Sequence, residues 1–292
     1  MPELPEIVTY LEALEPRIVG QPLERVRIKS FSLLKTFDPP IAEVDGATVT
    51  GLSRVGKRIV WELGDDYLVF HLMVAGRMRW RDRGAAIPGR IGLAAFDFPT
   101  GTIVLTEAGT KRRASLHLVR GAEALKALDP GGIEVIGSTL DDFSAGLLAE
   151  RHTLKRALSD ARFISGIGGA FADEILHRAK LSPTQMNTNL TDDEIARLHV
   201  AAIDILSEWT QRRREDIGDG FPEKVTAFHE AMAVHGKFGD PCPVCATPVQ
   251  RIVYASRETN YCPTCQTGGK ILADRSLSRL LKDDWPKTVD DL

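Results

Sequence analysis

The four cysteines constrain the fold of this chain more than any other feature. They form two Cys-x-x-Cys pairs separated by sixteen residues, and the other 288 positions of the 292 contain no cysteine. Two such turns can each present two thiolates, and this spacing is typical of a tetrahedral zinc site. Two disulfides or four free thiols are the alternatives, and the lack of a secretion signal argues against disulfides. We therefore expect one structural Zn²⁺, held by Cys242, Cys245, Cys262 and Cys265.

The residues between the two cysteine pairs predict a β-hairpin. The apolar run Ile252-Val253-Tyr254 indicates one strand, and residues 256–261 indicate the second. Because four thiolates fill the coordination sphere of zinc, we expect the metal to fold the hairpin and to take no part in chemistry. Arg257 then lies near the hairpin tip, where a guanidinium can hold a phosphate through two hydrogen bonds. The alternative is an ordinary exposed strand arginine.

The amino terminus reads Met-Pro-Glu-Leu-Pro-Glu and provides a second candidate site. Removal of Met1 would leave Pro2 as a free secondary amine with Glu3 and Glu6 close in sequence. A free α-amine has a pKa of about 8, so part of it is neutral at cytosolic pH. Such an amine can attack an electrophilic carbon and form an iminium. The alternative is a plain helix start, since proline and glutamate both suit a first helical turn.

The overall composition is that of an ordinary globular protein. Hydrophobic residues make up 43% of the chain and charged residues 26%, and no apolar run reaches the length of a membrane span. We therefore expect no membrane partner and a cytoplasmic location. A net charge of -3 and a pI of about 6.2 do not indicate a nucleic-acid partner, so such binding must rest on local basic clusters. The clusters are Lys57-Arg58, Lys111-Arg112-Arg113 and Arg212-Arg213-Arg214, with Arg251, Arg257 and Lys270 as single residues.

The period of the apolar residues divides the chain into a β-rich part and a helical part. After a first helix at about 8–18, residues 22–120 contain short runs of branched and aromatic residues, which predict an antiparallel β-sandwich or barrel. The glycine-rich stretch 128–132 indicates a linker. Helical patterns follow at about 140–150, 153–160, 170–180 and 191–214, the last with a capping box at its start. The predicted class is α+β, with four parts: residues 1–128, 129–235, 236–270 and 271–292.

A glycine-rich turn enters one of the predicted helices at residues 164–174. Gly166, Gly168 and Gly169 would expose backbone amides at a helix amino terminus, where a phosphate can bind. The alternative is a tight helix connection in which glycine only permits close packing. The lone histidines are expected to be packing or surface residues, because four cysteines already fill the zinc site. These histidines include His71, His177 and His229.

In combination, these features resemble the formamidopyrimidine-DNA glycosylase and endonuclease VIII family of base-excision repair enzymes. The resemblance covers residues 1 to about 268, with the motifs in the same order as in the family. It rests on the amino-terminal Pro-Glu-Leu-Pro-Glu, a β-turn lysine at Lys57, the glycine-rich turn within a helix-two-turns-helix element, the stretch from Phe228-His229 to Gly236-Lys237, and the zinc hairpin with Arg257.

The resemblance implies a bifunctional DNA glycosylase and abasic-site lyase that acts on damaged, chiefly oxidised, bases. In the family, the terminal proline attacks C1′ of the damaged nucleotide, the base leaves, and the iminium permits β- and δ-elimination. By this resemblance Pro2 is the nucleophile, Glu3 moves protons, Glu6 orients the amine and Lys57 binds a phosphate beside the lesion. The DNA contacts implied are Lys57, Arg112, Arg113, Gly168, Gly169, Lys237 and Arg257.

The expected partner is damaged double-stranded DNA, or abasic or single-stranded DNA, bound by a monomer. Two other functions stay open from the sequence. One is a binder of damaged DNA that retains the fold without turnover. The other is a zinc-hairpin regulator that reads DNA sequence, for which Pro2, Glu3 and Glu6 would be incidental.

The chain also departs from the family at positions that bear on the substrate. The glycine-rich turn has Gly169 where the family usually has an asparagine that contacts phosphate. The family fills the vacated base stack with a methionine, an arginine and a phenylalanine, whereas this chain has Val74 at the methionine position and Ala114 after Lys111-Arg112-Arg113. Either other side chains act as the wedge, with Met73, Arg112 or Arg113 as candidates, or the protein favours lesions that are already unstacked or single-stranded.

The C-terminal tail, residues 271–292, follows the zinc hairpin. Leu277, Leu280 and Leu281 recur at helical spacing beside Arg275 and Arg279, which predicts a short amphipathic helix. We expect its apolar side to pack against the body of the protein, with a partner contact as the second possibility.

Overall fold

The computed structural model describes residues 1–292 except 110, 224, 227, 255–256, 275–276 and 283–284. Its contacts divide the chain into two compact units, and the division falls within one long helix. The predicted boundaries at 128, 235 and 270 stay predictions. The first unit contains Met1–Pro130 and Trp209–Thr226, and the second contains Gly131–Glu208 and Ala227–Leu292.

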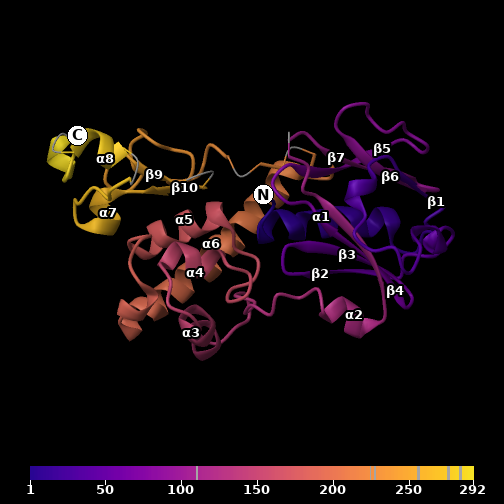
Figure 1. Ribbon diagram of the computed structural model, residues 1–292, viewed down its shortest axis with the longest axis horizontal. Coiled ribbons are helices and arrows are strands. Elements are labelled where there is room, and N and C mark those ends of the chain that lie inside the picture. The colour runs from indigo at the N-terminus through magenta and orange to yellow at the C-terminus, as the bar shows by residue number, and fades with distance from the viewer. Residues whose placement is uncertain (110, 224, 227, 255–256, 275–276, 283–284) are drawn as a thin grey trace. The chain divides into compact units, whose positions relative to one another are not determined.

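Two four-stranded antiparallel sheets form the body of the first unit (Figure 1). This arrangement confirms the predicted antiparallel β-rich domain within an α+β fold. In spatial order, one sheet contains β1 (Arg25–Ile28), β6 (Gly92–Phe98), β7 (Gly101–Glu107) and β5 (Gly76–Arg81). The other contains β2 (Gly51–Val55), β3 (Arg58–Leu63), β4 (Asp66–His71) and β8 (Ser115–Arg120). Short helices flank the strands: α1 (Leu4–Ile18), η1 (Phe31–Leu33), η2 (Ile41–Val44) and α2 (Ala122–Lys126).

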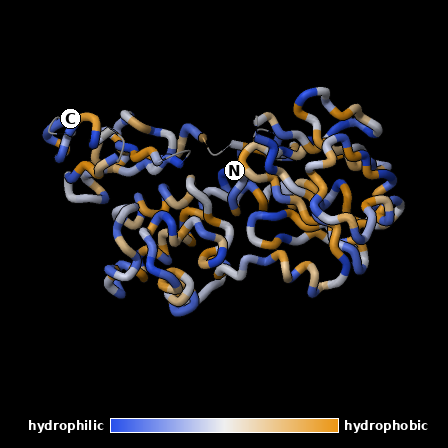
Figure 2. Tube along the Cα trace, viewed as in Figure 1, coloured by the Kyte–Doolittle hydropathy of each residue, from blue (hydrophilic) through white to orange (hydrophobic). Residues whose placement is uncertain are grey.

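Aromatic side chains fill the core between the sheets. The ring centroid of Trp61 lies 4.5 Å from that of Phe70 and 5.2 Å from that of Phe96, and all three side chains are fully buried. Figure 2 shows hydrophobic residues along these strands. Helix α1 adds its apolar stripe to the same core, with Tyr10 and Leu14 also fully buried. This burial fixes the helix, and with it the amino terminus, against the sheets.

Helices dominate the second unit. They are α3 (Leu140–Leu148), α4 (Leu154–Ser159), α5 (Gly169–Ala179), η3 (Asn187–Asn189) and α6 (Asp192–Ile217), the last of which continues into the first unit. The predicted capping box at the start of α6 is confirmed: the Thr191 amide donates to Glu194 Oε2 at 3.0 Å, and the Glu194 amide donates to Thr191 Oγ1 at 3.3 Å. Among the described residues, no helix combines the length and the apolar character needed to cross a membrane.

The predicted hairpin is present as two antiparallel strands, β9 (Gln250–Tyr254) and β10 (Arg257–Tyr261), followed by α7 (Pro263–Thr267). The tail then folds back: the Ile271 amide donates to the Lys287 carbonyl and the Val289 amide to the Gly269 carbonyl. It contains α8 (Leu277–Leu281) and η5 (Val289–Asp291).

The expected packing of the tail leucines is wrong for two of the three. Leu280 is 76% exposed and Leu281 41% exposed. The tail contacts the hairpin at other residues, since the Leu272 amide donates to the Tyr261 hydroxyl and the Val253 amide donates to Asp274 Oδ2. Arg275 and the side chain of Leu277 lie outside the described residues.

Candidate functional site

The amino terminus is both a helix cap and a buried polar cluster. Helix α1 begins at Leu4 with Glu3 as its N-cap, and the Glu3 amide donates to Glu6 Oε2 at 2.9 Å. Glu3 is only 2% exposed, Glu6 only 3%, and Pro2 is also buried. An ordinary cap would leave these carboxylates in water. Here the first turn draws two acidic side chains inside the protein beside the chain terminus.

Two cations lie within electrostatic range of the terminal amine. The terminal amine of this chain is that of Met1, and burial lowers its pKa from the ordinary value of about 8. Glu3 and Glu6 raise this pKa, whereas Arg77 and Lys57 lower it further. A lowered pKa increases the neutral, nucleophilic fraction at neutral pH. The structure thus brings the predicted Lys57, from the β2–β3 turn, toward the terminus. It also adds Arg77, at the start of β5, which no sequence motif had singled out.

Arg213 forms a buried ion pair with Glu6. Its Nε donates to Glu6 Oε1 at 3.0 Å, its Nη2 donates to the Thr226 carbonyl at 2.7 Å, and its side chain is 8% exposed. Burial raises the pKa of Glu6 to about 7, although Arg213 and the Glu3 amide both act in the opposite direction. Glu6 is therefore a carboxyl group that titrates near neutral pH. Sequence reasoning saw Arg213 only as one of three consecutive arginines.

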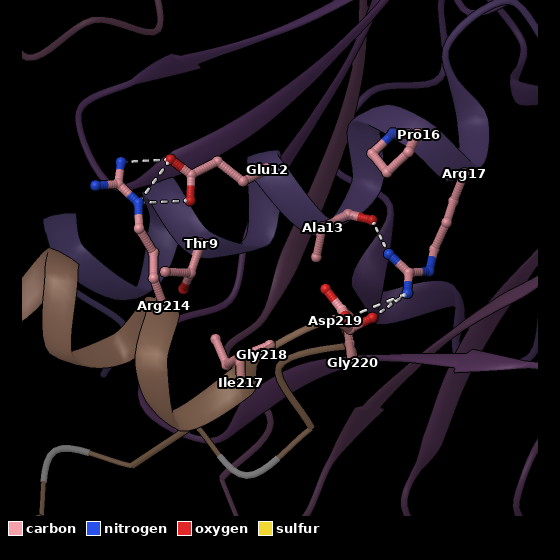
Figure 3. Close-up of a pocket in the computed structure, with 10 residues that line it drawn as sticks. All are labelled: Thr9, Glu12, Ala13, Pro16, Arg17, Arg214, Ile217, Gly218, Asp219 and Gly220. Carbon is pink, nitrogen blue, oxygen red and sulfur yellow. Dashed lines mark hydrogen bonds and ion pairs between the residues drawn. The ribbon is translucent and has the colours of Figure 1, made fainter.

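Contacts between α1 and the end of α6 hold Arg213 in place. Figure 3 shows Arg214 paired with Glu12, and Arg17 reaching from α1 to the carbonyl groups that follow α6. The Arg214–Glu12 pair has an N···O distance of 2.5 Å, and Arg17 Nη2 donates to the Gly220 carbonyl at 3.1 Å. These contacts border a groove of about 470 Å³. A second recess of about 290 Å³ is lined by Glu6, Thr9, Arg213, Asp216, Ile217, Phe221, Pro222, Glu223 and Val225.

Several basic side chains lie near His71 at the end of β4. The pKa of His71 is lowered to about 4, chiefly by burial and also by Arg58, Lys57 and His117. His71 pairs with Ser115 of β8 in the sheet register, which puts His117 two residues along the same strand. His71 is therefore neutral at pH 7 and lies among cations. The sequence predicted only a packing or surface role for it.

The turn after β4 presents Val74 to solvent. The Gly76 amide closes this turn on the Leu72 carbonyl at 2.9 Å, and Arg77 Nη1 donates to the Val74 carbonyl at 3.1 Å. Met73 adopts the left-handed region at φ 52°, and Val74 is 59% exposed. Val74, at the family's methionine position, is thus exposed, whereas the wedge candidate Met73 is half-buried.

Ala114 cannot act as a wedge, because its side chain is buried. The Glu107 carboxylate accepts hydrogen bonds from the amides of Arg113 at 3.0 Å and Ala114 at 3.1 Å, which draws this segment inward and leaves Ala114 5% exposed. Arg112 and Arg113 remain exposed, and Arg112 Nη2 donates to the Arg90 carbonyl. Residue 110 lies outside the described residues.

In the second unit, the glycine-rich turn begins helix α5. Gly168 is the buried N-cap, Gly169 is the exposed first residue, and Gly166 has φ 79°. A Cβ atom added at Gly169 would meet nothing within 4 Å. Close packing therefore does not explain the glycine at position 169.

The four cysteine sulfurs form one cluster. They all lie within 4.8 Å of one another, with no disulfide among them, which excludes the predicted alternative of two disulfide bridges. Four thiolates at this spacing fit a closed tetrahedral site for a single structural Zn²⁺. His177 of α5 lies beside the cluster, with Nε2 3.3 Å from Cys242 Sγ. Burial lowers the pKa of His177, so its neutral ring can donate an N–H to that sulfur.

A buried polar network connects the zinc hairpin to α4 and α5. Lys155 Nζ donates to Asp173 Oδ1 at 2.6 Å and to the Glu258 carbonyl of β10 at 2.7 Å. Asp173 is fully buried, and its second oxygen lies 2.9 Å from His235 Nδ1. The network fixes β10, and so the exposed Arg257 at its start, relative to the helix that carries Gly168 and Gly169. Lys237 lies near Asp240, with an Nζ···Oδ2 distance of 3.9 Å.

Family models match most of the chain in three blocks. The formamidopyrimidine-DNA glycosylase N-terminal domain matches residues 1–116, and the formamidopyrimidine-DNA glycosylase H2TH domain matches residues 136–218. The zinc finger found in FPG and IleRS matches residues 239–268. The tail beyond residue 268 lies outside all three models.

Curated relatives and solved structures agree with these matches. The formamidopyrimidine-DNA glycosylase of Symbiobacterium thermophilum is 32% identical over 279 residues, which covers 91% of this chain and 89% of the relative. The enzyme of the same name from Thermus thermophilus is 32% identical and covers 92% of this chain and 100% of the relative. The Lactococcus lactis Fpg bound to DNA with an abasic site has a TM-score of 0.79 at 26% identity, covering 91% of this chain and 99% of that one. The Thermus thermophilus MutM structure has a TM-score of 0.75 at 30% identity, with 91% and 98% covered.

Proposed function

Because this chain belongs to the formamidopyrimidine-DNA glycosylase family, we propose that it excises damaged bases from DNA through Pro2 and then cleaves the strand at the abasic site by β- and δ-elimination. The observation that carries this proposal is the buried cluster at the amino terminus. Two carboxylates, a buried arginine and two further cations lie around the chain terminus, where burial lowers the pKa of the Met1 amine. A helix cap alone has no use for such a cluster.

Pro2 supplies the nucleophile once Met1 is removed. Its nitrogen then attacks C1′ of the damaged nucleotide, the bond to the base breaks, and the base leaves with a proton. The bond between C1′ and the ring oxygen O4′ then breaks, O4′ takes up a proton, and the Pro2 nitrogen and C1′ are left joined as an iminium. Proton loss from C2′ then permits elimination of the 3′ phosphate, and a second elimination releases the 5′ phosphate. With Met1 attached, the Pro2 nitrogen is an amide and cannot start this sequence.

Glu3 and Glu6 have different roles in this scheme. Glu3 is the N-cap beside Pro2 and moves protons during ring opening and elimination. Glu6 is held by Arg213 and the Glu3 amide, so it orients the first turn and keeps a carboxyl group of pKa about 7 near the amine. Arg213 is a positioning residue, since it acts through Glu6.

The DNA contacts fall on both units, each with its own donors. In the first unit, Lys57 binds a phosphate beside the lesion, and Arg112 and Arg113 are the exposed cations of the loop after β7. In the second unit, the donors are the amides at Gly168 and Gly169, together with Lys237 and Arg257. The recess of about 290 Å³ beside Glu6 is a candidate position for a base that has left the stack.

A second candidate is a protein that acts mainly as a lyase on abasic or single-stranded DNA. The buried Ala114 and the small Val74 favour it, because neither offers a large apolar side chain to fill a vacated stack. A binder of damaged DNA without turnover would have the same fold but would form no covalent intermediate.

Borohydride trapping tests the proposal. Incubation with an oligonucleotide that carries an abasic site should give a covalent adduct, and peptide mapping should find it at Pro2. Intact mass first establishes that Met1 is absent. A variant with a leucine inserted between Met1 and Pro2 is expected to retain Met1 and to lose both trapping and strand cleavage, whereas the same leucine added after Leu292 should leave both intact. An adduct that maps to a lysine would refute Pro2 as the nucleophile.

A further inference from the structure

Two phenylalanines on one short segment are the most exposed large hydrophobic side chains in the described part of the chain. Phe31 is 81% exposed and Phe37 is 77% exposed. They lie in the segment 30–37, which follows β1 and contains η1. Exposure of one apolar side chain is common, but two exposed aromatic rings within seven residues call for an explanation.

This segment is firmly attached to the sheet, so its exposed rings do not arise from a loose loop. The Lys35 amide donates to the Leu116 carbonyl at 2.9 Å, and Thr36 Oγ1 accepts from the Leu118 amide at 2.8 Å. Leu33, between the two rings, is 1% exposed and belongs to the core. The segment therefore runs along β8 with its leucine inside and its phenyl rings outside.

A row of basic side chains leads from the terminal amine to this segment. Sheet pairing sets β3, β4, β8 and the segment side by side: Ile59 pairs with Phe70, His71 with Ser115, and Leu34 forms a bridge with Leu116. Lys57 lies in the β2–β3 turn, Arg58 at the start of β3 and His71 at the end of β4. His117 lies on β8 and Lys35 on the segment.

The electrostatic effects of these residues on the pKa values of their neighbours follow the order of the row. Lys57 acts on the terminal amine and on His71, Arg58 acts on His71 and His117, and Lys35 acts on His117. Three strand spacings of about 4.8 Å separate β3 from the segment, a span of about 14 Å.

We propose that Phe31 and Phe37 form a stacking surface for single-stranded DNA that flanks the lesion, at the end of the basic row that lies away from the chain terminus. This inference rests on the proposed function and names its substrate class: lesions within, or at the edge of, single-stranded DNA. Aromatic rings stack on any unpaired base, while cations beside them hold the phosphates. Bases in a duplex are already stacked and offer no free face to a phenyl ring.

The buried Ala114 supports the same substrate class independently. A duplex lesion must be extruded, and the gap that it leaves is costly unless a side chain fills it. Ala114 cannot fill that gap, since it is 5% exposed and faces the core. A lesion in a single strand leaves no paired stack to refill. By the family resemblance, position 114 belongs to the element that supplies an aromatic wedge, and this chain has no aromatic ring there.

The test uses a stable abasic analogue with a fluorescent label and measures affinity by anisotropy. The analogue is placed in a duplex whose labelled strand continues as a single strand of eight nucleotides on its 5′ side or on its 3′ side. Two further substrates have single-stranded flanks of only two nucleotides, one on each side. A fifth substrate is fully duplex. The Phe31→Ala/Phe37→Ala double variant should lose about five- to tenfold in affinity for one of the two long-flank substrates. It should bind the short-flank and fully duplex substrates as the wild type does.

Two further variants separate stacking from general apolar contact. Phe37→Trp should restore at least wild-type affinity for the long flank in a Phe31→Ala background, whereas Phe37→Leu should not. Leu280→Ala is the matched control, because that side chain is 76% exposed but lies on the tail, and it should change none of the affinities.

Equal losses on all substrates, or no loss on any, would overturn the inference. So would a change in sedimentation of the free double variant, because it would assign the rings to contact between copies of the chain. Borohydride trapping on duplex abasic DNA is run on the same preparations. If trapping succeeds while flank dependence is absent, the stacking surface is wrong and the proposed function stands; if trapping fails, the proposed function is wrong.

Discussion

Glu6→Gln is the substitution that most directly probes the buried cluster at the amino terminus. Glutamine keeps the shape of the protonated side chain and removes its titration. In the wild type, the pKa of Glu6 is about 7 in the folded protein, against an ordinary value of 4.5. This difference of about 2.5 pKa units corresponds to about 3 kcal/mol of unfolding free energy, since each pKa unit is worth about 1.4 kcal/mol.

Proton binding to Glu6 sets the sign of the effect. Between pH 4.5 and about 7 the folded protein retains a proton on Glu6 that the unfolded chain has released. Folding therefore becomes less favourable as pH rises through this window, and the change levels off above about pH 7. The wild type should lose about 3 kcal/mol of unfolding free energy across the window through this one group. The Glu6→Gln variant lacks that contribution, so the difference between the two proteins should grow with pH.

Urea unfolding at pH 5, 6, 7 and 8 measures this difference. Three of the four tryptophans, at positions 61, 80 and 209, lie in the first unit, so tryptophan fluorescence reports mainly on that unit. Arg213→Gln should cost about 3–5 kcal/mol at pH 8, where it leaves a buried carboxylate unpaired, and less at pH 5. Arg214→Gln is the neighbouring control, because its exposed pair with Glu12 should contribute less than about 1 kcal/mol. Parallel pH profiles for the wild type and Glu6→Gln would refute the assignment of a raised pKa to Glu6.

Three further substitutions address other parts of the fold. Gly169→Asn should fit without strain, because an added Cβ meets nothing within 4 Å. It should raise the affinity for abasic duplex DNA about fivefold, measured by anisotropy. Unchanged affinity would exclude a phosphate at this turn. His177→Phe removes the N–H donor that lies 3.3 Å from Cys242 Sγ, so it should speed the release of zinc to a chromogenic chelator several-fold. An unchanged release rate would count against that hydrogen bond. Gly76→Ala should lower the unfolding free energy by about 1–3 kcal/mol in urea, because its Cβ would lie 2.3 Å from the Leu72 carbonyl oxygen; a neutral result would mean that the turn relaxes.

The features predicted correctly from sequence are those in which close neighbours in the chain determine the structure. The cysteine spacing predicted the hairpin, because two CxxC turns and sixteen residues leave few other ways to gather four sulfurs. The Thr191–Glu194 capping box predicted the start of α6 for the same reason. Short runs of branched and aromatic residues predicted the antiparallel sheets of the first unit, although not the order of their strands.

Arg213 and Arg77 were missed because their roles depend on contacts between distant segments. Arg213 pairs with a residue 207 positions away, and Arg77 acts on the terminal amine from the start of β5. A local signal for Arg213 did exist. It lies four residues after the buried Trp209 and so continues the apolar stripe of α6, where an arginine is unusual. The exposure of Leu280 was also missed. Helical spacing predicts that a helix has an apolar face, but it does not predict which residues, if any, cover that face.

The choice between a helix cap and a reactive amino terminus can be argued from what the cap requires. A carboxylate at the first turn stabilises a helix while exposed to water, and it needs no partner elsewhere. Glu6 instead is 3% exposed and depends on Arg213, itself buried, from a distant part of the chain. Buried ion pairs seldom stabilise a fold more than apolar side chains of similar size. A cluster that costs stability and surrounds the chain terminus therefore favours the proposed chemistry at Pro2 over a helix cap alone.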